Sequence, residues 1–229
     1  MRKGQQGFTL IEIAIVLVII GLLLGGVLKG QELIQNARVR NIIAQQDGVK
    51  SAYFGFQDRY RGIPGDYPAV DALRNIPGVA VAGVCPAGVV CGTAAGMSDS
   101  LINSAQESIT AWFHLSRAGF ITGSYDGIGA APAPNNSPTN PFGGFMQLIY
   151  DNNYYPAGGG NPSVTNVKTG KNIPSTVLGE VDRKIDDGSP ITGSFRFSLY
   201  DGTQAACVTA ANVWDVSGGQ SVCGGTSLF

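Results

Sequence analysis

Hydrophobic residues fill the chain from Phe8 to Leu28, and Glu12 is the single charged side chain among them. As a helix this stretch would extend about 31 Å, close to the roughly 30 Å of a bilayer's hydrocarbon core. The pattern therefore predicts a membrane-spanning helix. An acidic side chain near the centre of such a helix costs about 2.5 to 3.5 kcal/mol, and Glu12, although nearer the end, should still be unfavourable unpaired. Its position predicts a cationic partner.

From Lys29 the pattern becomes amphipathic, and apolar residues recur at loose helical spacing to about Tyr60. A turn at Ile63-Pro64-Gly65 should end the helix. We therefore expect one long helix, of which 8–28 is the membrane half and 29–60 an amphipathic continuation that packs under the head. Residues 61–229 should form a single globular head.

Within the head, the pattern predicts helices, short strands and turn-rich connections, which together give an α+β fold with a small antiparallel sheet. Ser98 or Asp99 should cap the first helix, and Gly119 should stop it. The expected elements are a helix at Ser98–Ala118, a loop at Gly119–Pro141, a strand at Gly143–Tyr155, turns at Asn161–Gly170, a short helix at Ile173–Ile185 and a strand at Phe195–Tyr200.

The charges around the apolar stretch predict its orientation. Arg2 and Lys3 precede it, and the positive-inside rule then leaves the N-terminus cytoplasmic and places the head across the membrane. A cleaved secretory signal is disfavoured, because the stretch is longer than the usual apolar core and no small-x-small site follows it. We expect a single-pass protein with an extracytoplasmic head.

Four cysteines lie in the head, and an even number in an exported domain predicts two disulfides. Three pairings are open. We favour Cys85 with Cys91 and Cys207 with Cys223, because each pair brackets a short segment rich in turn residues. Zinc is disfavoured, since no CxxC pair is present and the single histidine, His114, is distant in sequence.

Composition and motifs argue against catalysis and against general nucleic-acid binding. The formal net charge is −1, so no basic footprint is present. The head contains no G-x-S-x-G elbow, HExxH helix or P-loop. His114 has no evident nucleophile or acidic partner in sequence, so we expect it to be structural or exposed. The sequence predicts neither an enzyme nor a cofactor.

The N-terminal residues carry a specific resemblance. Met1-Arg-Lys-Gly-Gln-Gln-Gly7 is followed by Phe8-Thr9-Leu10-Ile11-Glu12 and an apolar helix. This arrangement resembles the leader of type IV pilins and of the pseudopilins of type II secretion. The resemblance implies that a prepilin peptidase cuts between Gly7 and Phe8 on the cytoplasmic face and methylates the new amine of Phe8. Residues 1–7 would then be a leader peptide, and the anchor would be retained.

The resemblance also implies a function and a set of partners. The chain would be a structural subunit that assembles head-to-tail with other pilins through its N-terminal helix. It would be a minor pilin, a major pilin or a pseudopilin. Phe8 and Glu12 would carry the assembly contact. Its partners would include the inner-membrane assembly platform with its ATPase. The purpose of the filament stays open, and secretion, motility, adhesion and DNA uptake are the alternatives. The alternative is a membrane-tethered binding or enzymatic module that uses a pilin-like anchor.

A metal site is the remaining candidate in the head. Asp182, Asp186 and Asp187 could offer oxygen ligands to calcium, which the resemblance to major pseudopilins also suggests. The spacing is not that of an EF-hand loop, however, and Arg183 and Lys184 partly neutralise the group. We interpret the segment mainly as a helix end that turns through Asp187-Gly188 toward a strand.

Overall fold

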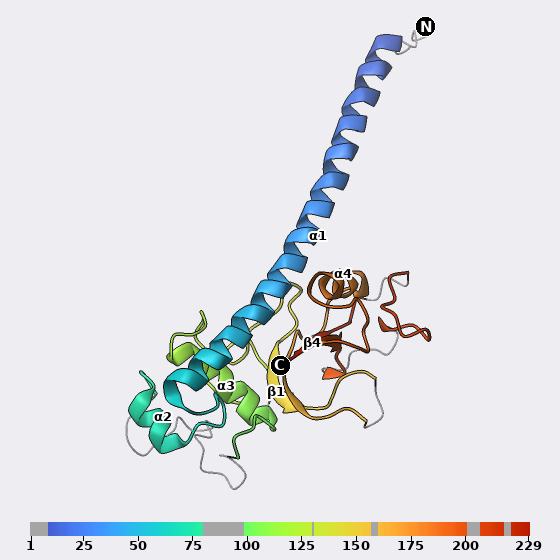
Figure 1. The fold of residues 1–229 in the computed structure, drawn as a ribbon. Helices are drawn as coiled ribbons and strands as arrows, with labels where there is room; N and C mark the ends of the chain where they lie inside the picture. The colour runs from blue at the N-terminus through green and yellow to red at the C-terminus, as the bar shows by residue number, and fades with distance from the viewer. Residues whose placement is uncertain (1–8, 80–98, 130, 157–159, 201–206, 218–220) are drawn as a thin grey trace. The chain divides into compact units, whose positions relative to one another are not determined.

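A computed structural model describes residues 9–79, 99–129, 131–156, 160–200, 207–217 and 221–229. The chain divides into two compact units, Met1–Arg38 and Val39–Phe229. Helix α1 (Leu10–Tyr60) belongs to both units (Figure 1). It ends where the sequence pattern predicted, and Arg61 follows it in the left-handed conformation (φ 56°) that commonly closes a helix.

The two parts of α1 have opposite surroundings. In the first unit, the apolar side chains of Leu10–Leu28 are exposed, and this helix is long and apolar enough to cross a membrane. In the second unit, one face of the helix is buried in the head. Apart from Ala52, its buried residues recur at spacings of three and four, which places them on one stripe: Val39, Ile42, Gln46, Val49, Tyr53 and Phe56.

The described residues of the second unit form three shorter helices, α2 (Ala69–Asn75), α3 (Ala105–Arg117) and α4 (Ser175–Ile185). The predicted cap of α3 was wrong. The helix starts after Ser104, whose side chain accepts a hydrogen bond from the backbone of Glu107 while the Glu107 carboxylate accepts one from the backbone of Ser104. This reciprocal capping box satisfies two backbone donors, so it defines the start more strongly than a lone Ser or Asp upstream.

Four antiparallel strands form one sheet in the order β1-β2-β4-β3. This confirms the predicted small antiparallel sheet and the α+β class. The strands are β1 (Gln147–Asp151), β2 (Val164–Lys168), β3 (Phe195–Phe197) and β4 (Gly225–Leu228).

Strand β2 lies in the segment that was predicted to be turns, and the prediction failed because two of its three buried residues, Asn166 and Lys168, are polar. Lys168 is fully buried and forms an ion pair with Asp151 of β1. Asn166 donates to Asp151 and accepts from the Thr226 hydroxyl of β4. Because polar groups occupy inward positions of this strand, the usual alternation of apolar and polar residues is lost.

The part of the head that the structure describes packs around two hydrophobic clusters. The Trp112 cluster contains residues of α1, α2 and α3 and of the first two strands. The Trp214 cluster joins α1 to α4, β3 and the segment after it. Their main buried members are Val49, Tyr53, Phe56, Ile76, Trp112, Phe113, Leu115 and Leu148 in the first, and Val39, Ile42, Leu178, Val181, Phe195, Phe197 and Trp214 in the second.

Candidate processing and assembly segment

Glu12 takes part in the N-terminal cap of α1. The backbone N–H and the hydroxyl of Thr9 both donate to a Glu12 carboxylate oxygen, at 2.8 and 2.9 Å. In return the Glu12 backbone N–H donates to the Thr9 hydroxyl at 3.3 Å. The pair forms a capping box, in which the first and fourth residues of a helix start satisfy each other's donors. Sequence reasoning missed this role, although the signal Thr9-x-x-Glu12 was present.

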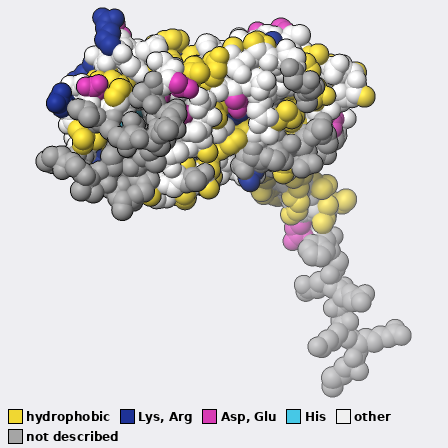
Figure 2. All heavy atoms as spheres, turned by 90° about the horizontal axis from the view of Figure 1, so that it is seen from below, with side chains coloured by type: hydrophobic (Ala, Val, Ile, Leu, Met, Phe, Trp, Pro, Cys, Tyr) yellow, Lys and Arg dark blue, Asp and Glu magenta, His cyan; other side chains and the backbone are white. Residues whose placement is uncertain are grey.

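The cap does not neutralise the carboxylate. Thr9 supplies dipoles but no positive charge, and no described lysine or arginine forms an ion pair with Glu12. The side chains around it are exposed and apolar, Leu10 at 92% and Ile11 at 68%. In Figure 2, hydrophobic side chains cover the visible surface of the apolar part of α1. The charge of Glu12 therefore lacks a counterion in the described part of this subunit.

The predicted cleavage residues Gly7 and Phe8 lie outside the described residues. The same holds for Cys85 and Cys91, so their pairing stays a prediction. In the head, the predicted bond between Cys207 and Cys223 is confirmed, with a Cα–Cα distance of 5.8 Å.

The disulfide connects the Trp214 cluster to the sheet. Both cysteines are fully buried in that cluster. Cys223 exchanges two backbone hydrogen bonds with Ile173, just before α4, and lies next to β4 in the chain. The bond therefore holds the C-terminal segment 207–223 next to the start of α4.

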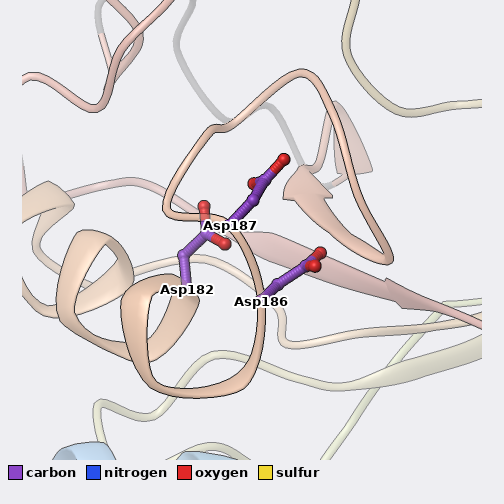
Figure 3. A group of neighbouring side chains, drawn as sticks. All are labelled: Asp182, Asp186 and Asp187. Atoms are coloured by element: carbon purple, nitrogen blue, oxygen red, sulfur yellow. The ribbon is translucent and has the colours of Figure 1, made fainter.

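Asp182, Asp186 and Asp187 come together at the end of α4 and in the loop after it (Figure 3). One oxygen of each lies within 4.8 Å of the others. The protein itself supplies donors to all three. Asp182 accepts from the Trp214 indole N–H at 2.6 Å, Asp186 from the backbone of Ser194 and Phe195, and Asp187 from the Thr192 hydroxyl and the Ser189 backbone.

Burial changes the titration of this group. Asp182 is fully buried, and desolvation raises the pKa of its carboxyl to about 6, against the lowering effect of the hydrogen bonds from Trp214 and Gly188. Asp187 is exposed, and the hydrogen bond from Thr192 lowers its pKa. The hydrogen bonds show a structural role for the three side chains, which pin the loop between α4 and β3. Calcium at this place stays a prediction.

His114 belongs to the core of the head. Its Nδ1 accepts a hydrogen bond from the Gly65 backbone at 3.0 Å, and its ring is stacked on Phe56. Among the residues that the structure describes, none forms a hydrogen bond with Nε2, and burial lowers the pKa of the imidazole to about 4. The ring is therefore neutral at ordinary pH and serves packing, in line with the structural role that the sequence suggested.

Comparison with known proteins gives one match. Residues 2–28 match the family model of the prokaryotic N-terminal methylation motif. Searches of curated proteins and of solved structures returned no match to the chain. The match covers the basic residues, the Gly7-Phe8 junction, Glu12 and the apolar helix. The N-terminal segment of this chain thus carries the type IV pilin and pseudopilin signature.

Proposed function

We propose that the chain is a structural subunit of a type IV pilus-like filament, as a pilin or a pseudopilin. Prepilin peptidase would cut between Gly7 and Phe8 and methylate the amine of Phe8. The subunit would stay anchored in the bacterial inner membrane, with its N-terminus cytoplasmic and its head periplasmic. It would then enter the filament with other pilins through the inner-membrane platform and its ATPase. The methylation motif supports processing by the peptidase, and the apolar helix fits a membrane-anchored pilin.

One observation carries the assembly step, namely the carboxylate of Glu12 on an exposed apolar helix without a counterion in the described residues. Cleavage before Phe8 creates an α-amine at the edge of the same helix. The amine of one subunit is suited to neutralise Glu12 of a neighbour, which removes the penalty of an isolated charge and sets the axial register of the two helices. A head-to-tail contact of this kind repeats without closing and so builds a helical filament.

The capping box supplies the sharpest test, because it separates the charge of Glu12 from its hydrogen bonds. Glu12→Gln keeps an acceptor for the Thr9 donors and removes the charge, since glutamine also completes a capping box. We expect Glu12→Gln to reduce filament incorporation at least tenfold, as strongly as Glu12→Val. The measurement is the amount of the chain in filaments released by shearing, relative to the amount in membranes.

Thr9→Val is the matched control, because it removes the hydroxyl and keeps the charge. It should leave incorporation within about twofold, since the loss of one cap changes helix stability by only about 1 kcal/mol. Normal incorporation of Glu12→Gln together with a defect in Thr9→Val would show that Glu12 acts as a cap and would refute the charge pair. A chain that stays monomeric in the membrane under assembly conditions would favour the tethered module instead.

Processing has an independent readout. Mass spectrometry of the membrane fraction should find a mature N-terminus at methylated Phe8 in the wild type and in all three variants. An N-terminus at Met1 in cells with active peptidase would contradict the proposed cleavage without bearing on the charge pair.

A further inference from the structure

Lys168 of β2 is a buried amine that the proposed function does not use. Its side chain has no exposed surface, and of the lysines and arginines that the structure describes it is the only buried one. Lysine is seldom fully buried, because the protein interior disfavours its charged form. Desolvation accordingly lowers the pKa of the Lys168 amine, against the raising effect of Asp151. Burial therefore moves this amine toward its neutral form, which is a nucleophile.

The Asp151 carboxylate lies at the tip of this side chain. Strand pairing places Asp151 opposite Val164 and not opposite Lys168, so the lysine side chain extends along the sheet to reach it. The Lys168 Nζ forms an ion pair with Oδ2 of Asp151. The Asp151 side chain is 23% exposed, and the centre of the Tyr200 ring lies 5.7 Å from Nζ. The amine and the carboxylate are thus held in contact in a site that is mostly shielded from water.

The other oxygen of Asp151 is held by two N–H donors. The side-chain amide of Asn166 donates to Oδ1 at 3.0 Å, and the backbone N–H of Asn153 donates to it at 3.2 Å. Asn166 is fully buried, and its own oxygen accepts from the Thr226 hydroxyl, which fixes the direction of its amide. Such donors stabilise the negative charge that a carboxyl oxygen gains when a nucleophile attacks the carbon beside it. Asp151 therefore has a nucleophile at one oxygen and donors for an oxyanion at the other.

We propose that Lys168 and Asp151 become joined by an isopeptide bond, a side-chain amide between Nζ and Cγ. The ammonium transfers one proton to Oδ2, and the neutral amine attacks Cγ while Asn166 and Asn153 stabilise Oδ1. The nitrogen then gives a second proton to Oδ2, the Cγ–Oδ2 bond breaks, and Oδ2 leaves as water. Oxidation state does not change and no further reactant is consumed, because an amine and a carboxyl group condense to an amide and water.

Burial favours the amide over the ion pair. Two charges in the interior have lost their hydration, whereas an amide is neutral. The contact between the two groups also replaces a collision of separate molecules, which raises the effective concentration of the amine at Cγ. The bond ties β1, an edge strand of the sheet, to β2. It is separate from Glu12 and does not depend on filament assembly.

Mass spectrometry of the denatured full-length chain, extracted from its membrane, tests the proposal. After correction for disulfides and N-terminal processing, the mass should be lower than the sequence mass by one water molecule. Chymotrypsin cuts after Tyr154, between the two residues, and the two peptides should stay joined, with fragment ions that place the link between Lys168 and Asp151. Trypsin should leave the chain uncut after Lys168 and should cut after Lys171, which serves as the internal reference.

Lys168→Arg is the matched variant, because arginine keeps a cation beside Asp151 and its guanidinium does not condense with a carboxylate under these conditions. The variant should have the full sequence mass, and its chymotryptic peptides should separate. Lys171→Arg changes a partly exposed lysine just after β2 and should keep the loss of water.

Three results would overturn the proposal. The first is a wild-type chain of full sequence mass that trypsin cuts after Lys168, since the pair is then only ionic. The second is a loss of water that persists in Lys168→Arg, because a cyclic imide at an aspartate has the same mass. The third is a link from Lys168 to Asn166 with loss of ammonia. The joined peptides are sought in the wild type itself, so the outcome does not depend on whether a variant folds.

Discussion

The two hydrophobic clusters of the head pack on the same helix but bury opposite kinds of titratable group. The Trp112 cluster encloses His114, a base whose pKa is lowered to about 4 by desolvation. The Trp214 cluster lies against Asp182, an acid whose pKa is raised to about 6 by desolvation. The second cluster also contains the disulfide, and the first contains none among its described residues. Similar apolar packing thus coexists with different electrostatics.

Because of this difference, acid changes the stability of the head in two opposite directions. Folded His114 binds fewer protons than unfolded His114, so its contribution to stability is complete above pH 6.5 and is lost as the pH falls toward 4. Folded Asp182 binds more protons than unfolded Asp182. Its contribution is therefore complete below pH 3.8 and is lost as the pH rises through about 6. Between these limits the two effects oppose each other.

The largest expected effect tests whether the clusters unfold together. Phe56→Ala removes a fully buried ring from the Trp112 cluster and should lower the free energy of unfolding by about 3 to 5 kcal/mol. Ile42→Ala does the same to the Trp214 cluster, with an expected loss of about 2 to 5 kcal/mol. Urea unfolding, followed by fluorescence of Trp112 and Trp214 in single-tryptophan variants, gives the measurement.

If α1 couples the clusters into one cooperative unit, each substitution lowers the midpoint seen by both tryptophans. Separate midpoints, each lowered by one substitution only, would show two independent units. Phe54→Ala is the control, since that ring is 52% exposed and its loss should have a smaller effect.

Removal of the disulfide should affect the Trp214 cluster first. Cys207→Ser with Cys223→Ser opens a loop with a sequence separation of 16, and the chain-entropy model gives a loss of about 3 kcal/mol. The fluorescence of Trp214 should therefore report unfolding at lower urea than in the wild type. An unchanged midpoint under oxidising conditions would mean that packing around α4 alone holds this part of the head.

The opposed titrations are tested by removing one group at a time. Asp182→Asn removes the opposing acid, so the contribution of His114 dominates and stability should rise by about 2 to 3 kcal/mol from pH 4 to pH 6.5. His114→Gln removes the opposing base, so the contribution of Asp182 dominates and stability should fall over the same interval by about 2 kcal/mol. Unfolding by urea at a series of pH values checks both slopes. Equal slopes in the two variants would contradict the assignment.

The smallest effect concerns Gln46, which lies on α1 between the residues that contact the two clusters. It is 1% exposed, and no described residue forms a hydrogen bond with its amide nitrogen or its oxygen. Gln46→Met keeps the shape and removes the unsatisfied groups, so stability should increase by about 1 kcal/mol. Gln57→Met, at a half-buried position of the same helix, should change stability by less than about 0.5 kcal/mol. A loss of stability in Gln46→Met would show that water satisfies the amide.

The long helix and the disulfide were predictable, because each depends on a local pattern. Apolar residues and helical spacing predicted α1 to Tyr60, and the bracketing of turn residues predicted Cys207 with Cys223. Strand β2 was not predictable, since Lys168 is stable in the interior only beside Asp151, which is 17 positions earlier in the chain. Helix α2 was also missed, because its seven residues follow Pro68 without a capping side chain.

For the candidate sites too, local features were predictable from the sequence and tertiary contacts were not. Glu12 was recognisable from the sequence as a charged residue within an apolar segment. Its capping role was missed, because Thr9 was not considered as its hydrogen-bonding partner. The closeness of Asp182, Asp186 and Asp187 follows from their spacing at a helix end. Their hydrogen bonds to Trp214, Thr192 and Phe195 depend on tertiary structure, which a sequence pattern does not contain.

The capping box of Thr9 and Glu12 has a consequence for a subunit that waits in the bilayer. Because Thr9 already solvates the carboxylate, a single helix in lipid does not hold a bare anion. Under the proposed function, recruitment then changes the groups that bind the Glu12 carboxylate. The α-amine of another subunit replaces the Thr9 donors or binds beside them. Under that proposal, the free energy of recruitment is the difference between two solvated states of the carboxylate, which is smaller than the full cost of an unpaired charge.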